Sequence, residues 1–207
     1  MTEASAEVAG LLLAGGQSRR MGGGDKCLRP LAGRPLLAHV IARVGPQVGS
    51  LALNANGDPT RFATFGLPVL ADVVEGFAGP LAGVLTGMLW ARQAAPGMRW
   101  LATFPTDAPF LPEDLVARLL AAAEGQGRPV ACAASDGRTH PPVALWDVGL
   151  AEDLQQAMTE EGMRKIDAWT ARHGVAEVAW PAGPVDPFFN ANRPDDLEAA
   201  ERLLAEG

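Results

Sequence analysis

Short apolar runs alternate along the chain with longer segments whose apolar residues recur at helical spacing. The runs predict strands at 8–13, 51–55, 68–70, 100–104, 129–133 and 142–146. The longer segments predict helices at 35–44 and 80–89, another that begins near 112, and further ones at 150–158, 163–172 and 194–205. Strands that alternate with helices form βαβ units, so the pattern predicts an α/β fold with a mainly parallel, doubly wound sheet in three layers.

Composition and charge narrow the class of protein. A chain of 207 residues that is 48% hydrophobic can bury a substantial core, and it fits one large α/β domain or at most two small ones. We expect a single domain over residues 1–207. The formal net charge of −7 argues against a general binder of nucleic acid or of a membrane surface. Cys27 and Cys132 lie far apart without a C-x-x-C partner, which favours a reduced cytoplasmic protein over a structural zinc site. No basic segment precedes the first apolar run, which argues against a signal peptide.

A glycine-rich loop with three cations follows the first predicted strand directly. The stretch 13–26 contains five glycines together with Arg19, Arg20 and Lys26. Glycine leaves backbone N–H groups unshielded and permits positive φ, so such a loop can wrap closely around phosphates while the cations add charge. The spacing fits neither the G-x-x-x-x-G-K-S/T loop nor the G-x-G-x-x-G fingerprint. The loop therefore predicts a phosphate site of another type.

Three polar residues lie at or just after the ends of further predicted strands: Asn54, Asp72 and Asp107. The carboxyl ends of parallel strands meet at one edge of a sheet, so we expect these residues beside the glycine-rich loop. Each aspartate taken alone is typical of a turn or a helix cap. Two carboxylates beside phosphates indicate a Mg²⁺ site, since this ion prefers one or two carboxylates with substrate phosphates and water.

The sequence does not pair a nucleophilic side chain with a base. No histidine is placed to activate Ser18, and no G-x-S-x-G motif occurs. A phosphate group on a second substrate needs no base, because its second pKa is about 6. The pattern thus favours transfer of a phosphoryl-type group by positioning and charge. His140 fits a structural role as well as a substrate contact, and Asn190 and Asn192 fit helix capping as well as substrate binding.

The cation-rich loop resembles the signature of bacterial molybdenum cofactor guanylyltransferases. The matching residues are Leu13-Ala14-Gly15-Gly16-x-x-Arg19-Arg20-Met21-Gly22-Gly23-x-Asp25-Lys26. The resemblance continues in order through Asn54-Ala55-Asn56, Asp72, Gly79-Pro80-Leu81-Ala82-Gly83, Pro105-x-Asp107-x-Pro109, Asp136-Gly137-Arg138-x-His140-Pro141 and Phe189-Asn190-x-Asn192. It spans nearly the whole chain, and the set together is specific for the family.

The resemblance implies a Rossmann-like nucleotidyltransferase fold and transfer of GMP from GTP, with Mg²⁺, to the terminal phosphate of molybdopterin or Mo-molybdopterin. It implies that GTP is held by Leu13, Ala14, Gly15, Gly16, Lys26, Asn54, Asp72 and Asp107. Asp107 would bind the metal, and Arg20 and Lys26 would offset charge on the α-phosphate and the departing pyrophosphate. Asn190 and Asn192 would face the pterin, and the stretch 164–165 the molybdopterin phosphate. Cofactor-delivery proteins and molybdoenzymes are the further partners that it implies.

Two other functions stay open from the sequence. One is a cytidylyltransferase for the same cofactor, against which Gly16 argues, because a bulkier residue there would crowd a purine. The other is a non-catalytic nucleotide-binding carrier, against which the retention of Asp72 and Asp107 beside Lys26 argues. Cys27 stands where the family commonly has glycine. A side chain at this position could narrow the space beside Lys26, but cysteine is small, and the departure does not argue against the activity.

Overall fold

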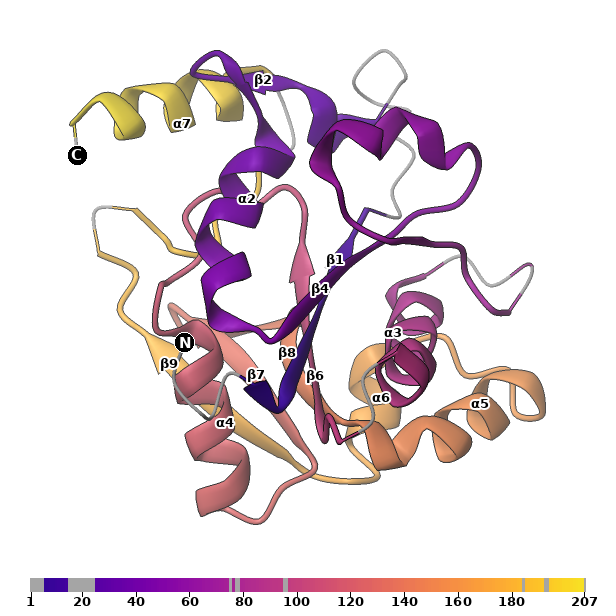
Figure 1. Ribbon diagram of the computed structural model, residues 1–207. Helices are drawn as coiled ribbons and strands as arrows, with labels where there is room; N and C mark the ends of the chain where they lie inside the picture. The colour runs from indigo at the N-terminus through magenta and orange to yellow at the C-terminus, as the bar shows by residue number, and fades with distance from the viewer. Residues whose placement is uncertain are drawn as a thin grey trace.

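Seven strands form one twisted sheet that lies between two layers of helices (Figure 1). The computed structural model describes residues 6–14, 25–74, 76, 79–94, 97–183, 185–191 and 194–206. The strand order across the sheet is β5-β4-β1-β6-β8-β7-β9. In chain order these strands are β1 (Val8–Leu13), β4 (Ser50–Asn54), β5 (Val69–Leu70), β6 (Trp100–Pro105), β7 (Val130–Ser135), β8 (Arg138–Asp147) and β9 (Val175–Trp180).

The sheet is mainly parallel, as predicted, with one antiparallel strand. Strands β5, β4, β1 and β6 run parallel to one another, and β9 runs parallel to β7. Strand β8 runs antiparallel to both of its neighbours, β6 and β7. The cause is the two-residue turn that joins β7 to β8, in which Asp136 and Gly137 have φ values of 48° and 71°. Two residues with positive φ form the hairpin turn that Asp-Gly favours, and so short a turn can join only antiparallel strands.

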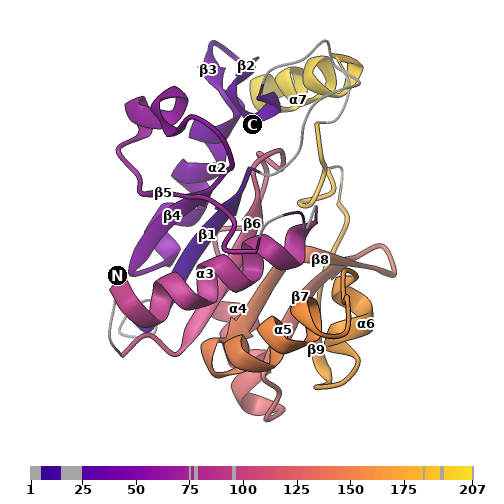
Figure 2. The same ribbon diagram turned by 90° about the vertical axis from the view of Figure 1, so that its right-hand side faces the viewer.

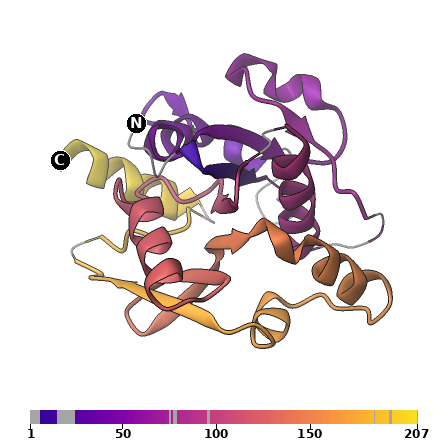
Figure 3. The ribbon, with the colours of Figure 1, turned by 60° about the horizontal axis from the view of Figure 1, so that its bottom comes forward.

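Both faces of the central strands are buried, which explains their unbroken apolar sequences. Along β1, Val8 and Leu12 belong to one core, which includes α2 (Leu36–Val44) and α4 (Leu115–Gly125). Ala9 and Leu11 belong to a second core on the opposite face. The helices of that face are α3 (Pro80–Ala94), α5 (Ala151–Thr159) and α6 (Ile166–Thr170), which lie together on one side of the sheet in Figures 2 and 3. The three-layer prediction is confirmed.

Several boundaries differ from those predicted, and β9 was missed. In β9 only every second residue is buried, beginning with Ala176, because the strand lies at the edge of the sheet. Helix α4 begins at Leu115, three residues after Pro112, and α6 covers only five residues of the predicted 163–172. Strand β8 is longer than the predicted 142–146, because the hairpin extends pairing back to Arg138.

A small third core joins residues 30–36 to the C-terminal segment. The hairpin of β2 (Pro30–Leu31) and β3 (Arg34–Pro35) packs beside helix α7 (Pro194–Glu206), as Figures 1 and 2 show. The fully buried residues of this core are Leu31, Leu36, Ala191 and Ala200. The remaining elements are the 3-10 helices η2 (Lys26–Leu28), η3 (Gly45–Gln47), η4 (Pro59–Phe65) and η5 (Val148–Leu150). Among the described helices, none is long and apolar enough to cross a membrane.

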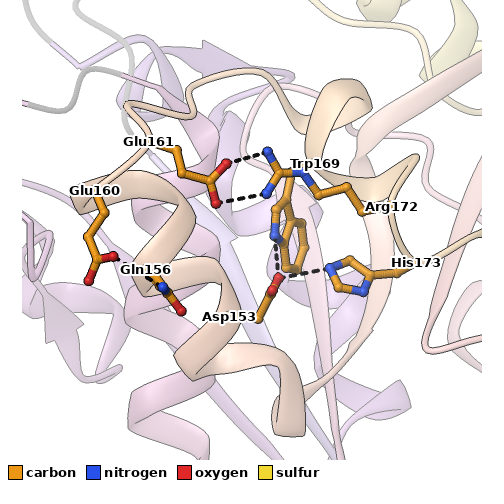
Figure 4. Close-up of polar contacts among 7 residues, drawn as sticks. All are labelled: Asp153, Gln156, Glu160, Glu161, Trp169, Arg172 and His173. Carbon is orange, nitrogen blue, oxygen red and sulfur yellow. Dashed lines mark hydrogen bonds and ion pairs between the residues drawn. The ribbon is translucent and has the colours of Figure 1, made fainter.

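Polar contacts hold α6 and the turn after it against α5 (Figure 4). The carboxylate of Asp153 on α5 accepts a hydrogen bond of 2.8 Å from the indole N–H of Trp169, and Nε2 of His173 lies 2.8 Å from the same oxygen. Arg172 forms two hydrogen bonds with Glu161, of 3.0 and 2.6 Å. The Trp169 ring is fully buried, so its N–H requires the partner that Asp153 supplies. Helix α6 is therefore short but firmly attached.

Candidate active site at the carboxyl edge of the sheet

The carboxyl ends of β1, β4, β5 and β6 lie side by side, as the parallel order requires. Leu13 pairs with Asn54 on one side and with Pro105 on the other, and Asn54 pairs in turn with Leu70. The N–H of Ala14 donates to the backbone oxygen of Asn54 at 3.0 Å, so the chain leaves β1 close to the end of β4. The predicted edge is confirmed: the residues that follow these strands face one region of space.

The candidate catalytic lysine and the candidate metal ligand contact each other. Nζ of Lys26, the first residue of η2, lies 2.6 Å from Oδ2 of Asp107, two residues after β6 ends. Their side chains are 15% and 24% exposed, so the pair is partly shielded yet open to a ligand. The sequence predicted only that these residues lie at the same edge of the sheet; the structure shows that they are in direct contact.

The candidate nucleotide residues of β4 and β5 form a second cluster. The side-chain amide of Asn54 donates hydrogen bonds of 2.9 Å to Oδ1 of Asp72 and 3.1 Å to the backbone oxygen of Leu70. Asn56 donates from its amide to the other carboxylate oxygen of Asp72 at 2.8 Å and accepts from the N–H of Asp72 at 2.9 Å. Asp72 is therefore held from both sides. Both amide protons of Asn54 are used, so Oδ1 of this buried side chain is left as its acceptor.

Helix α3 approaches this cluster closely because Gly83 has no side chain. A Cβ at position 83 would lie 2.5 Å from Oδ1 of Asn54 and 2.7 Å from a methyl group of Leu13. Both distances are shorter than real Cβ contacts, so only glycine fits this position without a shift of its neighbours. The start of the same helix lies near the basic stretch 164–165, since a Cβ on Gly79 would be 3.8 Å from the backbone oxygen of Arg164.

The segment before α7 reaches the same edge. The N–H of Ala191 donates to the backbone oxygen of Asp107 at 2.9 Å, and the neighbouring Asn190 is exposed. The structure thus places Asn190 beside the candidate metal ligand. Four predicted site residues lie outside the described residues: Gly15, Gly16, Arg20 and Asn192.

A partly buried network anchors this segment to the hairpin of β7 and β8. The hydroxyl of Ser135, which is buried, lies 2.9 and 3.1 Å from the carboxylate oxygens of Asp186 and 2.7 Å from Nε2 of His140. A hydroxyl that donates to Asp186 must accept from His140, so the histidine is the donor and cannot act as a base toward Ser135. Asp186 also accepts from the N–H of Phe188 at 2.9 Å, and the Phe188 ring lies 4.6 Å from that of His140. Burial lowers the pKa of His140 below its ordinary value, an effect that Asp186 opposes. In the structure His140 has a structural role.

Two features of the site differ from the sequence analysis or were absent from it. Cys27 does not narrow the space beside Lys26; its side chain is buried in the core, where burial and the nearby Asp25 raise its pKa to about 11. Arg61 was missed, although Nε of its guanidinium lies 2.5 Å from Oδ2 of Asp25, the residue before Lys26. The sequence holds one signal for Arg61: it follows Asp58 and Pro59, a pair that is typical of the start of a turn.

The residues at this edge suit a hard divalent cation bound through a nucleotide. Asp107 supplies a partly exposed carboxylate, already next to a cation in Lys26. Across the described ranges, no group of three or more histidine, cysteine, aspartate or glutamate residues could hold a metal by itself. A metal at Asp107 would therefore take its other ligands from phosphates and water, the arrangement that Mg²⁺ prefers.

Comparison with known proteins gives consistent results. A family model described as "MobA-like NTP transferase domain" matches residues 10–175. A Bradyrhizobium protein named molybdenum cofactor guanylyltransferase is 57% identical over 198 residues, which cover 96% of this chain and 93% of that protein. Its namesake from Mesorhizobium japonicum is 52% identical over 201 residues, with 96% of each chain covered.

The fold also resembles a solved structure from Archaeoglobus fulgidus, described as molybdopterin-guanine dinucleotide biosynthesis protein A. That structure has a TM-score of 0.73 and 23% identity, and the match covers 96% of this chain and all of the other. At this identity the likeness concerns the fold alone, and it agrees with the sheet order and layers described above.

Proposed function

Because the chain belongs to the MobA-like NTP transferase family, we propose that it transfers GMP from GTP to the terminal phosphate of molybdopterin. The products are molybdopterin guanine dinucleotide and pyrophosphate. The observation that carries the proposal is the contact between Lys26 and Asp107, at the edge of the sheet where the glycine-rich loop begins. The high identity to proteins named for this activity, over almost the whole chain, supports it.

The reaction needs positioning and charge more than a base. An oxygen of the molybdopterin phosphate forms a bond to the α-phosphorus of GTP while the bond to the β-phosphate bridge breaks, and pyrophosphate leaves with the electron pair. The attacking phosphate is already largely ionised at neutral pH, since its second pKa is about 6. The absence of a base from this reaction agrees with the hydrogen bonds of Ser135 and His140. These two residues bind each other, and Ser135 also binds Asp186. Lys26 and Arg20 would offset the negative charge that builds on the α-phosphate and on the leaving group.

The nucleotide would lie along the carboxyl edge. In the proposal the phosphates and the adjoining part of GTP are held by Leu13, Ala14, Gly15, Gly16 and Lys26. Asn54 presents its Oδ1 as an acceptor, which suits the N–H donors of guanine, and Asp72 lies within reach of the ribose. Gly83 leaves the room that this acceptor needs.

The second substrate and the metal complete the proposal. Asn190 and Asn192 would face the pterin, since the segment that carries them is bonded to the backbone of Asp107. Asp107 would hold Mg²⁺, which supplies positive charge to the phosphates when bound. The acceptor would be molybdopterin or Mo-molybdopterin, with delivery proteins and molybdoenzymes receiving the product. We further propose a single nucleotidyltransferase domain over residues 1–207 and a cytoplasmic location.

Substitution of Asp107 and Lys26 tests this assignment against a carrier that only binds nucleotide. Asp107→Ala and Lys26→Ala should each lower pyrophosphate release by at least about 100-fold, since each removes charge that acts mainly in the transition state. Asp107→Ala should still bind GTP in a calorimeter. Glu152→Ala is a matched control, because Glu152 forms an exposed ion pair with Arg92 on the helices below. Wild-type release by Asp107→Ala would contradict the proposal.

A further inference from the structure

The guanidinium of Arg61 joins two parts of the active site that are far apart in the sequence. Arg61 lies on η4, and its Nε is 2.5 Å from Oδ2 of Asp25. Its other two nitrogens donate to backbone oxygens, at 2.6 Å to Asn56 and at 2.7 Å to Asp58. The side chains of Arg61 and Asp25 are 29% and 24% exposed, so this is a partly shielded pair rather than a solvated one. The two terminal nitrogens of this planar group are hydrogen-bonded, whereas Nε contacts Asp25 as an ion pair without hydrogen-bond geometry.

One end of this link is the turn that carries the catalytic lysine. Asp25 directly precedes Lys26, and its backbone oxygen accepts the first bond of η2, from the N–H of Leu28 at 3.0 Å. An aspartate in this position commonly caps its own turn through its side chain. Here the carboxylate makes no such capping bond and points to Arg61 instead. Arg61 therefore fixes the residue from which the Lys26 turn starts.

The other end is the cluster proposed to read the nucleoside. The backbone oxygen of Asn56 accepts from Arg61, while the side chain of Asn56 holds Asp72 through two hydrogen bonds. Asp72 in turn accepts from Asn54. A continuous chain of polar contacts thus runs from Asn54 through Asp72, Asn56 and Arg61 to Asp25, next to Lys26.

We infer that Arg61 is a positioning residue that holds the Lys26 turn in a fixed placement relative to the Asn54–Asp72 pair. The inference rests on the proposed function and deepens it. One GTP molecule must engage both ends at once, and the gain from doing so depends on their separation being set before binding. Arg61 acts through Asp25 and Asn56. A lysine could not replace it, because an ammonium lacks the planar fork that reaches three acceptors in different directions.

The consequence is a particular pattern of binding and rate. Ligands that occupy one end alone, such as guanosine or inorganic triphosphate, gain nothing from a fixed separation. GTP, which spans both ends, gains in affinity and above all in kcat. A merely structural Arg61 would instead lower thermal stability and leave the turnover of the folded fraction unchanged.

The test compares Arg61→Lys, Arg61→Ala and Asp25→Asn with Arg92→Ala, whose ion pair with Glu152 is exposed and lies on the lower helices. Calorimetry with guanosine should give dissociation constants within about twofold of wild type for all four variants. For the three variants of the link, kcat with GTP should fall about 10- to 100-fold, and Arg92→Ala should keep the wild-type value. Arg61→Lys retains the charge, so it serves if Arg61→Ala does not fold.

The combined variant of Arg61→Ala with Asp25→Asn sharpens the test. Because both substitutions break the same contact, the double variant should be no slower than the worse single variant by more than about twofold. Additive losses, or folded Arg61 variants with wild-type kcat, would overturn the inference. The proposed function is judged separately on the wild-type protein: if it releases no pyrophosphate with GTP and molybdopterin, that proposal fails whatever the Arg61 variants do.

Discussion

The substitution Gly83→Ala tests whether the close approach of α3 holds the nucleoside end of the site in place. A Cβ at position 83 would lie 2.5 Å from Oδ1 of Asn54 and 2.7 Å from Cδ2 of Leu13, so at least one neighbour must move. The Leu13 methyl group is the end of a flexible side chain. The Asn54 amide is not free to turn, because it donates to Asp72 at 2.9 Å and to the backbone of Leu70 at 3.1 Å. The added methyl group therefore displaces a side chain that two donated hydrogen bonds hold in place.

Two opposed contributions determine the change in the free energy of unfolding, and a third determines the change in GTP affinity. Overpacking of a close-packed interior costs about 1–3 kcal/mol, while alanine in place of glycine within a helix gains about 1 kcal/mol. The free energy of unfolding should thus fall by about 0–2 kcal/mol, or a few degrees in Tm for a chain of this size. Displacing Asn54 should remove its proposed hydrogen bond to GTP, which is worth about 1–3 kcal/mol, so GTP should bind about 5- to 150-fold more weakly.

Gly87→Ala is the matched control, one turn further along the same helix. A Cβ there would lie 2.7 Å from Cδ2 of Leu11 and 2.8 Å from Cδ2 of Leu101, an equally tight fit in a purely apolar setting. We expect a similar loss of Tm in thermal unfolding and a GTP dissociation constant within about twofold of wild type in calorimetry. Equal GTP affinities for the Gly83→Ala and Gly87→Ala variants would refute the reasoning.

Two further predictions concern buried titratable groups. Burial lowers the pKa of His140 below its ordinary value of 6.5. As the pH falls, this histidine is therefore protonated in the unfolded chain before it is protonated in the folded chain. Stability should therefore fall as the pH drops through about 6.5 and keep falling until the pH passes the lower pKa of the folded state. Urea denaturation should show a smaller loss for His140→Gln; an equal loss would exclude His140 as the cause. Burial raises the pKa of Cys27 to about 11 and of Cys132 to about 12, so a thiol reagent at about pH 8 should label neither in the folded protein and both in urea. Rapid labelling of the folded protein would contradict their burial.

The gathering of the site residues at one edge was predictable because it follows from chain direction alone. Parallel strands end at the same edge, so any polar residue after β1, β4, β5 or β6 had to lie there, and Asn54, Asp72 and Asp107 do. The direct contact of Lys26 with Asp107 was not predictable, since it depends on how η2 turns after Asp25.

Arg61 and β9 show what a single sequence hides. Arg61 comes from a 3-10 segment outside the alternating pattern, and its partner Asp25 is defined only by the fold. Strand β9 buries every second residue, a weaker apolar signal than that of the central strands. The β7–β8 hairpin did carry a signal, Asp136-Gly137, which favours an antiparallel turn.

Cys27 is a departure from the family pattern that lies next to the site in the sequence but not in the structure. Its neighbour Lys26 points to Asp107, whereas the Cys27 side chain turns into the core. Adjacent residues of a tight turn face different directions, and the sequence does not say which of them faces the site.

The most direct measurement is pyrophosphate release by the wild-type protein with GTP, CTP, ATP or UTP, in the presence of Mg²⁺ and molybdopterin. The account predicts release with GTP alone, dependent on both the metal and the acceptor. Release with CTP instead would assign the protein to cytidylyl transfer. Tight GTP binding without release would contradict the catalytic role proposed for Lys26 and Asp107 and would favour a nucleotide carrier.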